Sequence, residues 1–353
     1  MNPPGVYVIF KAPMKQDALL SVGAALFAAL TLISNLHAQP LVTIDTVTVG
    51  DAGNAADTTG YGAVADVFAI GKYEVTIGQY TTFLNSVATV TSDSYIVDLW
   101  TGSMATDLNI AGISRSGSGT LADPYSYSVI GSGNRPITYV SWFDAARFAN
   151  WMNNGATNGA STETGAYTLN GATNGIITVN PGATWSLPSE DQWYKAAYYK
   201  GGGTNAEYWV YPTQSAWGDA PGNIIGAAAN QANFYNGVFS VTQSADYSST
   251  QNYLTEAGNF SNSASAYGTF DQGGNVWEWS DAVMTGSTRG LRGGSWNDEV
   301  PNLEASTRSS GDPAGEGNFV GFRVATVPEP STYALLAMSA AGLGAYVLRR
   351  RCK

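Results

Sequence analysis

Residues 271–279 read Asp-Gln-Gly-Gly-Asn-Val-Trp-Glu-Trp, a short run in which two carboxylates flank a glycine-bearing turn. Calcium prefers six to eight hard oxygen ligands, and such a turn can supply side-chain and backbone oxygens together. The same residues also suit an ordinary capped, hydrogen-bonded turn. The stretch therefore predicts either a structural calcium site or a tight turn that leads into a tryptophan-rich segment.

Five further motifs occur with this stretch in a definite order along the chain. They are Tyr-Glu-Val-Thr at 73–76, Arg-Pro-Ile-Thr-Tyr-Val-Ser-Trp-Phe-Asp-Ala at 135–145, Leu-Pro-Ser-Glu-Asp-Gln-Trp at 187–193, Arg-Gly-Gly-Ser-Trp at 292–296 and Gly-Phe-Arg at 321–323. Together the six motifs span about residues 66–326 and resemble the formylglycine-generating (sulfatase-modifying factor) family. The resemblance implies an α+β fold of the C-type-lectin-like kind, with a single domain at 39–326, little regular secondary structure and long ordered loops.

The resemblance also implies two structural calcium sites. Matching the family motif position by position gives the first site the Asp271 and Glu278 side chains and the Gly274 and Val276 carbonyls. A second site would use Asn233 and the Phe234 carbonyl. Since the mature chain has no disulfide, a bound cation at either place would stabilise the fold by linking two loops.

The chemistry of the family is missing from the residues that should carry it. Family members hold copper with two cysteines shortly after the Gly-Gly-Ser-aromatic motif, and those positions here are Asp298 and Leu303. Cu(I) favours soft thiolate ligands, so copper is not expected. The only histidine is His37 and the only cysteine is Cys352, which lie in the two terminal signals described below. The related histidine-ligated iron chemistry and histidine-dependent triads are therefore excluded as well.

These observations predict a non-catalytic, calcium-stabilised extracellular domain that binds or acts as a scaffold. The expected partner is an extracellular polysaccharide or a surface protein, held in a groove at the place of the copper site. The candidate groove residues are Arg292, Trp296, Asp298 and Arg308. The alternative is a formylglycine-generating or other metal-dependent oxidoreductase that uses an atypical site.

Local patterns predict three helices and several short strands. Thr76, Ser141 and Ser189 each stand three residues before a residue able to complete a capping box, and apolar residues then recur at helical spacing. The helices should follow Thr76 directly, run from 142 to about 153, and run from 190 to 199. Strand-like segments lie at 41–49, 67–75, 185–187, 290–296 and 320–325, whereas 91–133 and 204–265 indicate loops.

Both ends of the chain have the features of sorting signals. Residues 14–38 combine Lys15, an apolar run and a small-residue end, which is typical of a secretory signal peptide. Met14 is a better translation start than Met1. The alternative interpretation of residues 14–38 is a buried core helix.

The C-terminal segment 327–353 has Pro-Glu-Pro at 328–330, an apolar helix predicted at 332–348 and three arginines after it. It resembles the PEP-CTERM signal of Gram-negative bacteria, which implies recognition by an exosortase and the secretion machinery, transient inner-membrane anchoring, and release or display at the cell surface. An ordinary membrane anchor is the alternative.

The part between these signals is strongly acidic. Residues 39–330 hold ten Lys and Arg against 26 Asp and Glu, which gives a formal charge of −16. Such a surface repels nucleic acid and anionic membranes. We therefore expect no nucleic-acid partner, and membrane contact only through the C-terminal helix.

Overall fold

Three capping boxes begin the principal helices, as the sequence predicts. Helix α2 spans Ile77–Val87, α4 spans Trp142–Asn153 and α5 spans Glu190–Tyr198. In each helix the N-cap hydroxyl accepts a hydrogen bond from the backbone N–H of the residue three positions later. The side chain of that later residue accepts a hydrogen bond from the N-cap N–H. These reciprocal bonds satisfy amide groups that the first helical turn otherwise leaves unpaired. A fourth, one-turn helix, α3, spans Ser103–Thr106.

The computed structural model describes residues 39–89, 99–204 and 207–326. The two predicted terminal signals, at 14–38 and 327–353, lie outside these ranges. Within the described ranges no helix has both the length and the apolar character needed to cross a membrane.

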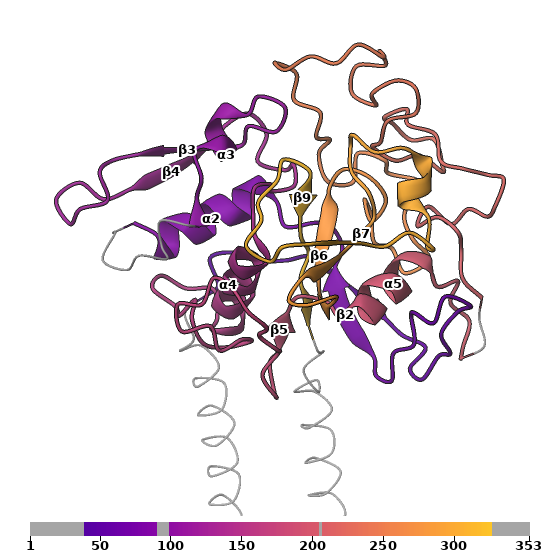
Figure 1. Cartoon of the computed structure of the whole chain (residues 1–353), viewed down its shortest axis with the longest axis horizontal. Helices are drawn as coiled ribbons and strands as arrows, with labels where there is room; N and C mark the ends of the chain where they lie inside the picture. The colour runs from indigo at the N-terminus through magenta and orange to yellow at the C-terminus, as the bar shows by residue number, and fades with distance from the viewer. Residues whose placement is uncertain (1–38, 90–98, 205–206, 327–353) are drawn as a thin grey trace, which may run out of the picture. The chain divides into compact units, whose positions relative to one another are not determined.

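The strands are short and form three sheets. One sheet has the order β1-β2-β10-β5 and another the order β8-β7-β6-β9, in which β9 runs parallel to β6. The third is the hairpin β3–β4. The strands are β1 Thr46–Val49, β2 Phe68–Gly71, β3 Ile113–Ser116, β4 Ser126–Val129, β5 Trp185–Ser186, β6 Trp277–Val283, β7 Arg289–Arg292, β8 Ser309–Gly311, β9 Val320–Gly321 and β10 Ala325–Thr326. Figure 1 shows α2 and α4 on one side of β6 and α5 on the other.

Each predicted strand segment contains or overlaps an observed strand, but the predicted bounds are wrong. The segment 41–49 is paired only from Thr46, and 320–325 divides into β9 and β10, which belong to different sheets. The hairpin β3–β4 lies inside 91–133, which the sequence indicated as loop. Its strands are rich in serine, and one face is largely exposed, so they have too little apolar alternation to be recognised.

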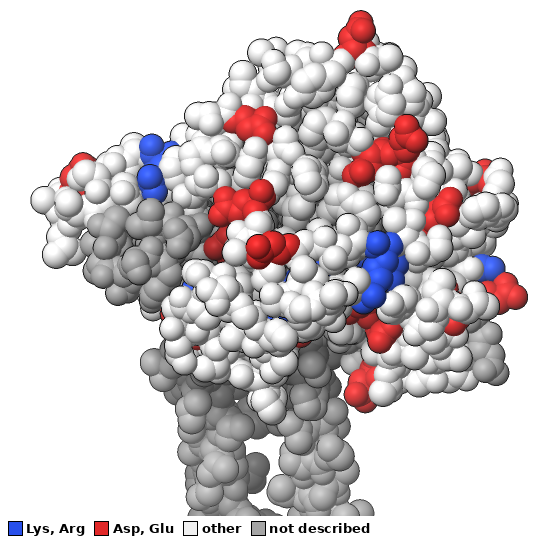
Figure 2. Space-filling model, viewed as in Figure 1, with Lys and Arg blue, Asp and Glu red and all other residues white. Residues whose placement is uncertain are grey.

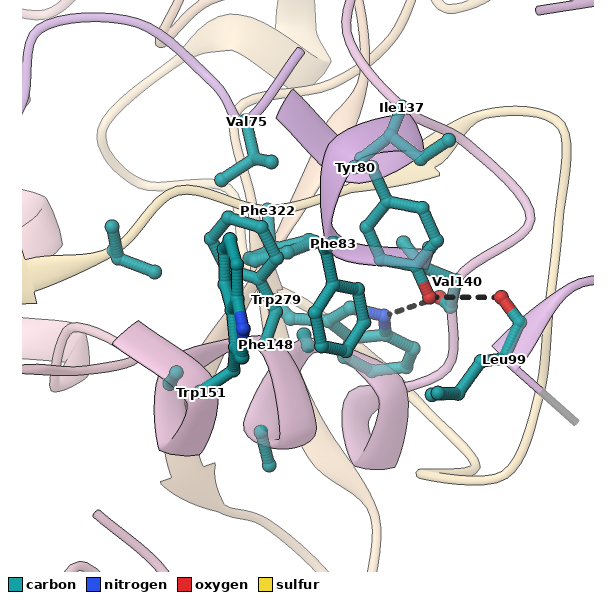
Figure 3. Packing of buried hydrophobic residues seen from close by; sticks show 14 of the residues in the cluster. Val75, Tyr80, Phe83, Leu99, Ile137, Val140, Phe148, Trp151, Trp279 and Phe322 are labelled. Atoms are coloured by element: carbon teal, nitrogen blue, oxygen red, sulfur yellow. Dashed lines mark hydrogen bonds between the residues drawn. The ribbon is translucent and has the colours of Figure 1, made fainter. Parts of the chain in front are cut away.

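Aromatic side chains from α2, α4 and the central strands form the main core. Phe83 packs edge-on against Phe148 at 5.3 Å between ring centroids, and Phe148 packs in the same way against Phe322 at 5.4 Å. The Trp279 indole donates to the Val140 carbonyl at 3.0 Å, so its polar atom is satisfied inside the core (Figure 3). Large buried rings stabilise a domain in which long loops must be ordered.

Candidate functional site

The 271–278 loop approaches the main chain of another loop so closely that only glycine fits. Gly274 has φ +79°, and a Cβ atom there would lie 2.2 Å from the Asn233 carbonyl oxygen. Asp271 and Asn275 also have positive φ, at 59° and 61°. Asparagine and aspartate tolerate this left-handed conformation better than other non-glycine residues. The sequence Asp-Gln-Gly-Gly-Asn is therefore matched to the shape of the turn.

Asn275 joins the two loops in which calcium sites were predicted. Its N–H donates to the Asn233 carbonyl at 2.7 Å, and its side-chain oxygen accepts from the Asn233 amide at 3.0 Å. The same oxygen accepts from the Thr255 N–H at 3.1 Å. All three residues are buried. Direct hydrogen bonds thus hold Asn233 beside the 271–278 loop.

Glu278 binds an arginine with both carboxylate oxygens. Arg323 donates to Glu278 Oε2 at 2.6 Å and to Oε1 at 2.7 Å, and the Trp193 indole donates to Oε2 at 2.7 Å. Arg323 also donates to the carbonyls of Gly71 and Phe270, each at 2.9 Å. Neither Glu278 nor Arg323 is exposed to solvent. This bidentate pair connects β6 to the segment between β9 and β10 and to the end of β2.

Two more carboxylates lie near the same guanidinium. Burial raises the pKa of Asp271 to about 6, although its Oδ2 accepts the Gly258 N–H at 2.7 Å. Burial, followed by the charge of Asp271, raises the pKa of Glu74 well above its usual range. Glu74 Oε1 accepts from Asn275 at 3.3 Å, whereas Oε2 has no hydrogen-bond partner among the described residues. Two buried acids, Glu74 and Glu278, and the partly buried Asp271 therefore share one internal cation.

The predicted calcium ligands fit an ion poorly. Glu278 faces a guanidinium that would repel a second cation, and the Phe234 carbonyl accepts from Asn223 at 3.2 Å. Across the described ranges, no three His, Cys, Asp or Glu residues are grouped so that they could hold a metal ion. Asp271 and the Gly274 and Val276 carbonyls are candidate ligands that no observation tests, and the guanidinium paired with Glu278 argues against an ion at this loop.

A melting experiment separates the two interpretations of this loop. A site saturated at one hundred times its dissociation constant would add about 2.7 kcal/mol of stability and raise the melting temperature by several degrees. Since Arg323 already compensates the charge of Glu278, we expect equal melting temperatures in excess calcium and in chelator. A shift of several degrees, with calcium detected by elemental analysis, would show that the loop binds the ion after all.

The four predicted groove residues form two separate clusters. Arg292 and Arg308 both bind Glu190, at 2.7 and 2.5 Å. Trp296 instead stacks on Tyr253 at 4.9 Å, and only 3% of its surface is exposed. Arg292 is likewise 1% exposed, so neither residue can form the wall of an open groove. The prediction of one groove fails because these polar and aromatic groups are used in packing.

The two positions that hold copper ligands in the family have structural roles in this chain. Asp298 Oδ2 accepts the Trp277 indole N–H at 2.8 Å and the Ser295 N–H at 3.0 Å. Leu303 is fully buried in a small apolar cluster that includes Phe234. An oxygen ligand and an aliphatic side chain cannot act as a thiolate pair. The residues present therefore do not fit copper.

Sequence reasoning identified the motifs but missed the partners of their charged residues. Glu74, Glu190 and Arg323 stand in the Tyr-Glu-Val-Thr, Ser-Glu-Asp and Gly-Phe-Arg motifs, and all three are buried. Only 12% of the chain is charged, and Glu74 and Arg323 each stand between apolar or aromatic neighbours, which was a signal of buried pairing; Glu190 had no such signal. Which acid meets which arginine was not readable from the sequence.

These features define a domain of the formylglycine-generating type whose metal ligands are replaced. The chain belongs to the family described as sulfatase-modifying factor enzyme 1-like domain, which matches residues 43–327. The PEP-CTERM protein-sorting motif matches residues 326–351. This motif implies processing by an exosortase and export to the cell surface or the medium.

The chain is also similar to individual known proteins. The chain is 27% identical over 217 residues to the formylglycine-generating enzyme of Streptomyces coelicolor, a match that covers 56% of this chain and 54% of that enzyme. It thus spans about half the length of this curated relative. The fold is similar to CarF (20% identity, 81% and 99% of the two chains, TM-score 0.45) and to PvdO from Pseudomonas aeruginosa (16%, 81% and 92%, TM-score 0.41).

Proposed function

We propose that this protein is a non-catalytic member of its family that acts outside the cell by binding. The observation that carries the proposal is the replacement of the copper-ligand positions by Asp298 and Leu303, each fixed by packing or hydrogen bonds. Restoring a metal site at these positions would require breaking the Asp298 contacts and opening an apolar cluster. The proposed role is therefore binding or scaffolding at the cell surface.

The retained parts of the domain support the same proposal. The buried pair of Glu278 and Arg323 and the contact of Asn233 with Asn275 maintain the shape of the fold and have no open position for a substrate. Figure 2 shows scattered acidic side chains and fewer basic ones on the visible face, which suits a soluble exported domain. What remains of the family pattern serves the fold.

An oxygen-consumption assay tests the absence of catalysis. The exported protein, loaded with Cu(I), is incubated with oxygen and a cysteine-containing peptide, and the Streptomyces coelicolor relative is the positive control. We expect no oxygen uptake above the buffer rate and no bound copper after dialysis, because no thiolate is present in residues 43–327. Copper-dependent turnover of the peptide would overturn the proposal.

A further inference from the structure

A surface groove of about 700 Å³ lies outside the cluster around Arg323. It forms where the segments 55–59, 207–210 and 305–306 meet beside Trp217. None of the predicted site residues line it. Its volume falls within the range of about 300–1,000 Å³ that is usual for small-ligand sites.

Two tryptophans give the groove its apolar character. Trp217 is 75% exposed, the largest exposure among the aromatic residues of the described ranges. Trp209 also lines the groove, and the Lys200 ammonium lies 4.6 Å from the centre of its ring. Exposing so much apolar surface to water is unfavourable. An exposed apolar patch at the rim of a concave surface is typical of a binding site.

The turn that carries these tryptophans is ordered by its own hydrogen bonds. The N–H groups of Val210 and Tyr211 donate to the Ser215 carbonyl at 3.1 and 3.2 Å, and the Asp219 N–H donates to the Ala216 carbonyl at 3.0 Å. Trp217 is thus held in place by a closed turn. Because the backbone is already ordered, a ligand that stacks on Trp217 loses less free energy to ordering.

The two charged residues that line the groove, Asp57 and Glu207, are both acidic. Asp57 accepts the Thr59 N–H at 2.7 Å and the Tyr194 hydroxyl, which holds its carboxylate in position. Glu207 is exposed and is paired with Lys200 at 2.8 Å. No Lys or Arg is among the residues that line the groove. An anionic ligand would therefore meet the Asp57 carboxylate without a lining cation to compensate its charge.

We propose that the groove between Trp209 and Trp217 binds an uncharged glycan chain. This proposal rests on the proposed function of the domain as a binding module. A pyranose ring has an apolar C–H face that stacks on indole and an edge of hydroxyls. Those hydroxyls donate to carboxylates such as Asp57, while the hydroxyls of Thr58 and Ser306 can act as donors or acceptors. A glycan fits the combination of aromatic faces and acceptors, because the nearby Lys200 ammonium is already paired with Glu207.

Titration calorimetry of the exported protein with defined oligosaccharides tests the proposal. The panel holds neutral hexasaccharides of glucose, galactose, mannose and N-acetylglucosamine, an anionic alginate hexamer and an amine-bearing glucosamine hexamer. We expect at least one neutral hexasaccharide to bind and the alginate hexamer to give no heat. Trp217→Ala should weaken that binding at least about tenfold, as removal of an aromatic anchor does at other interfaces.

Phe319→Ala is the matched control, because Phe319 is a 44% exposed aromatic residue that lines a different pocket. The Phe319→Ala variant should bind the neutral hexasaccharide with the affinity of the wild type. Phe319→Ala and Trp217→Ala should both melt at the wild-type temperature. Equal binding by wild type and Trp217→Ala would overturn the location. Absence of binding by every neutral hexasaccharide, or stronger binding of the alginate or the amine-bearing hexamer, would overturn the ligand class.

Sedimentation of the wild type and Trp217→Ala tests a second copy of the chain as the occupant. We expect both to be monomeric at the concentrations of the titration. A wild-type dimer that Trp217→Ala dissociates would show that the groove is a self-association surface and would overturn the glycan proposal. Neither result affects the oxygen-consumption assay, so failure of this proposal and failure of the non-catalytic assignment remain distinguishable.

Discussion

Replacing Arg323 by methionine should lower the free energy of unfolding by about 3–5 kcal/mol, the usual cost of removing one partner from a buried ion pair. The substitution leaves the Glu278 carboxylate buried beside Glu74 and Asp271, with the Trp193 indole as its one remaining donor in the described part of the chain. It also leaves the Gly71 and Phe270 carbonyls without their donor. Since a typical domain is stable by about 5–15 kcal/mol, the variant will be close to unfolding at 37 °C.

Urea unfolding followed by tryptophan fluorescence measures this loss. The control is the double variant Glu278→Gln with Arg323→Met, which removes the uncompensated charge and should recover part of the stability. A loss below about 1 kcal/mol in Arg323→Met, the range of exposed ion pairs, would contradict the central role of this pair. Stabilisation of Arg323→Met by calcium would show instead that the ion can replace the guanidinium at Glu278.

Gly274→Ala should be the second strongly destabilising change, with a loss of about 3 kcal/mol or more. The added methyl would lie 2.2 Å from the Asn233 carbonyl oxygen, and the backbone has φ +79°. To remove this overlap, the 271–278 loop and the Asn233 loop must separate, which breaks the bonds of Asn275 to Asn233. The effect thus combines backbone strain with the loss of a buried contact between two loops.

Gly286 provides a matched control for this substitution. It has φ +70°, close to that of Gly274, but nothing lies within 4 Å of the position of an added Cβ. Gly286→Ala should therefore lose only the cost of the left-handed conformation, about 1–2 kcal/mol. Chemical denaturation of both variants separates strain from overlap. If the two losses are equal, close packing against Asn233 does not constrain the loop.

The helices could be predicted because their signals are local. Thr76, Ser141 and Ser189 lie within three residues of the groups that they cap, so the sequence contains both partners of each contact. The ends of the strands could not be predicted in this way. Whether Leu41 or Thr46 is the first paired residue depends on β2, which supplies the other half of every ladder bond. Alternation along one strand does not contain that information.

The candidate site divides in the same way. The sequence predicted a glycine-bearing turn at 271–278, and the structure shows that Gly274 and Asn275 have positive φ there. The pairing of Glu278 with Arg323 could not be predicted from the sequence. Glu278 and Arg323 are 45 residues apart, and nothing local distinguishes a carboxylate that will meet a guanidinium from one that will meet calcium.

By itself, the sequence of residues 271–279 and its companion motifs determined the family, the class of fold and the absence of thiolate and imidazole from the domain. These properties depend on which residues are present and on their order. The tertiary structure alone decided that Arg323 compensates Glu278, that Asn233 lies against Gly274, and that Trp209 and Trp217 share a groove. Each of these is a contact between segments distant in sequence, and such contacts exist only once the chain has packed.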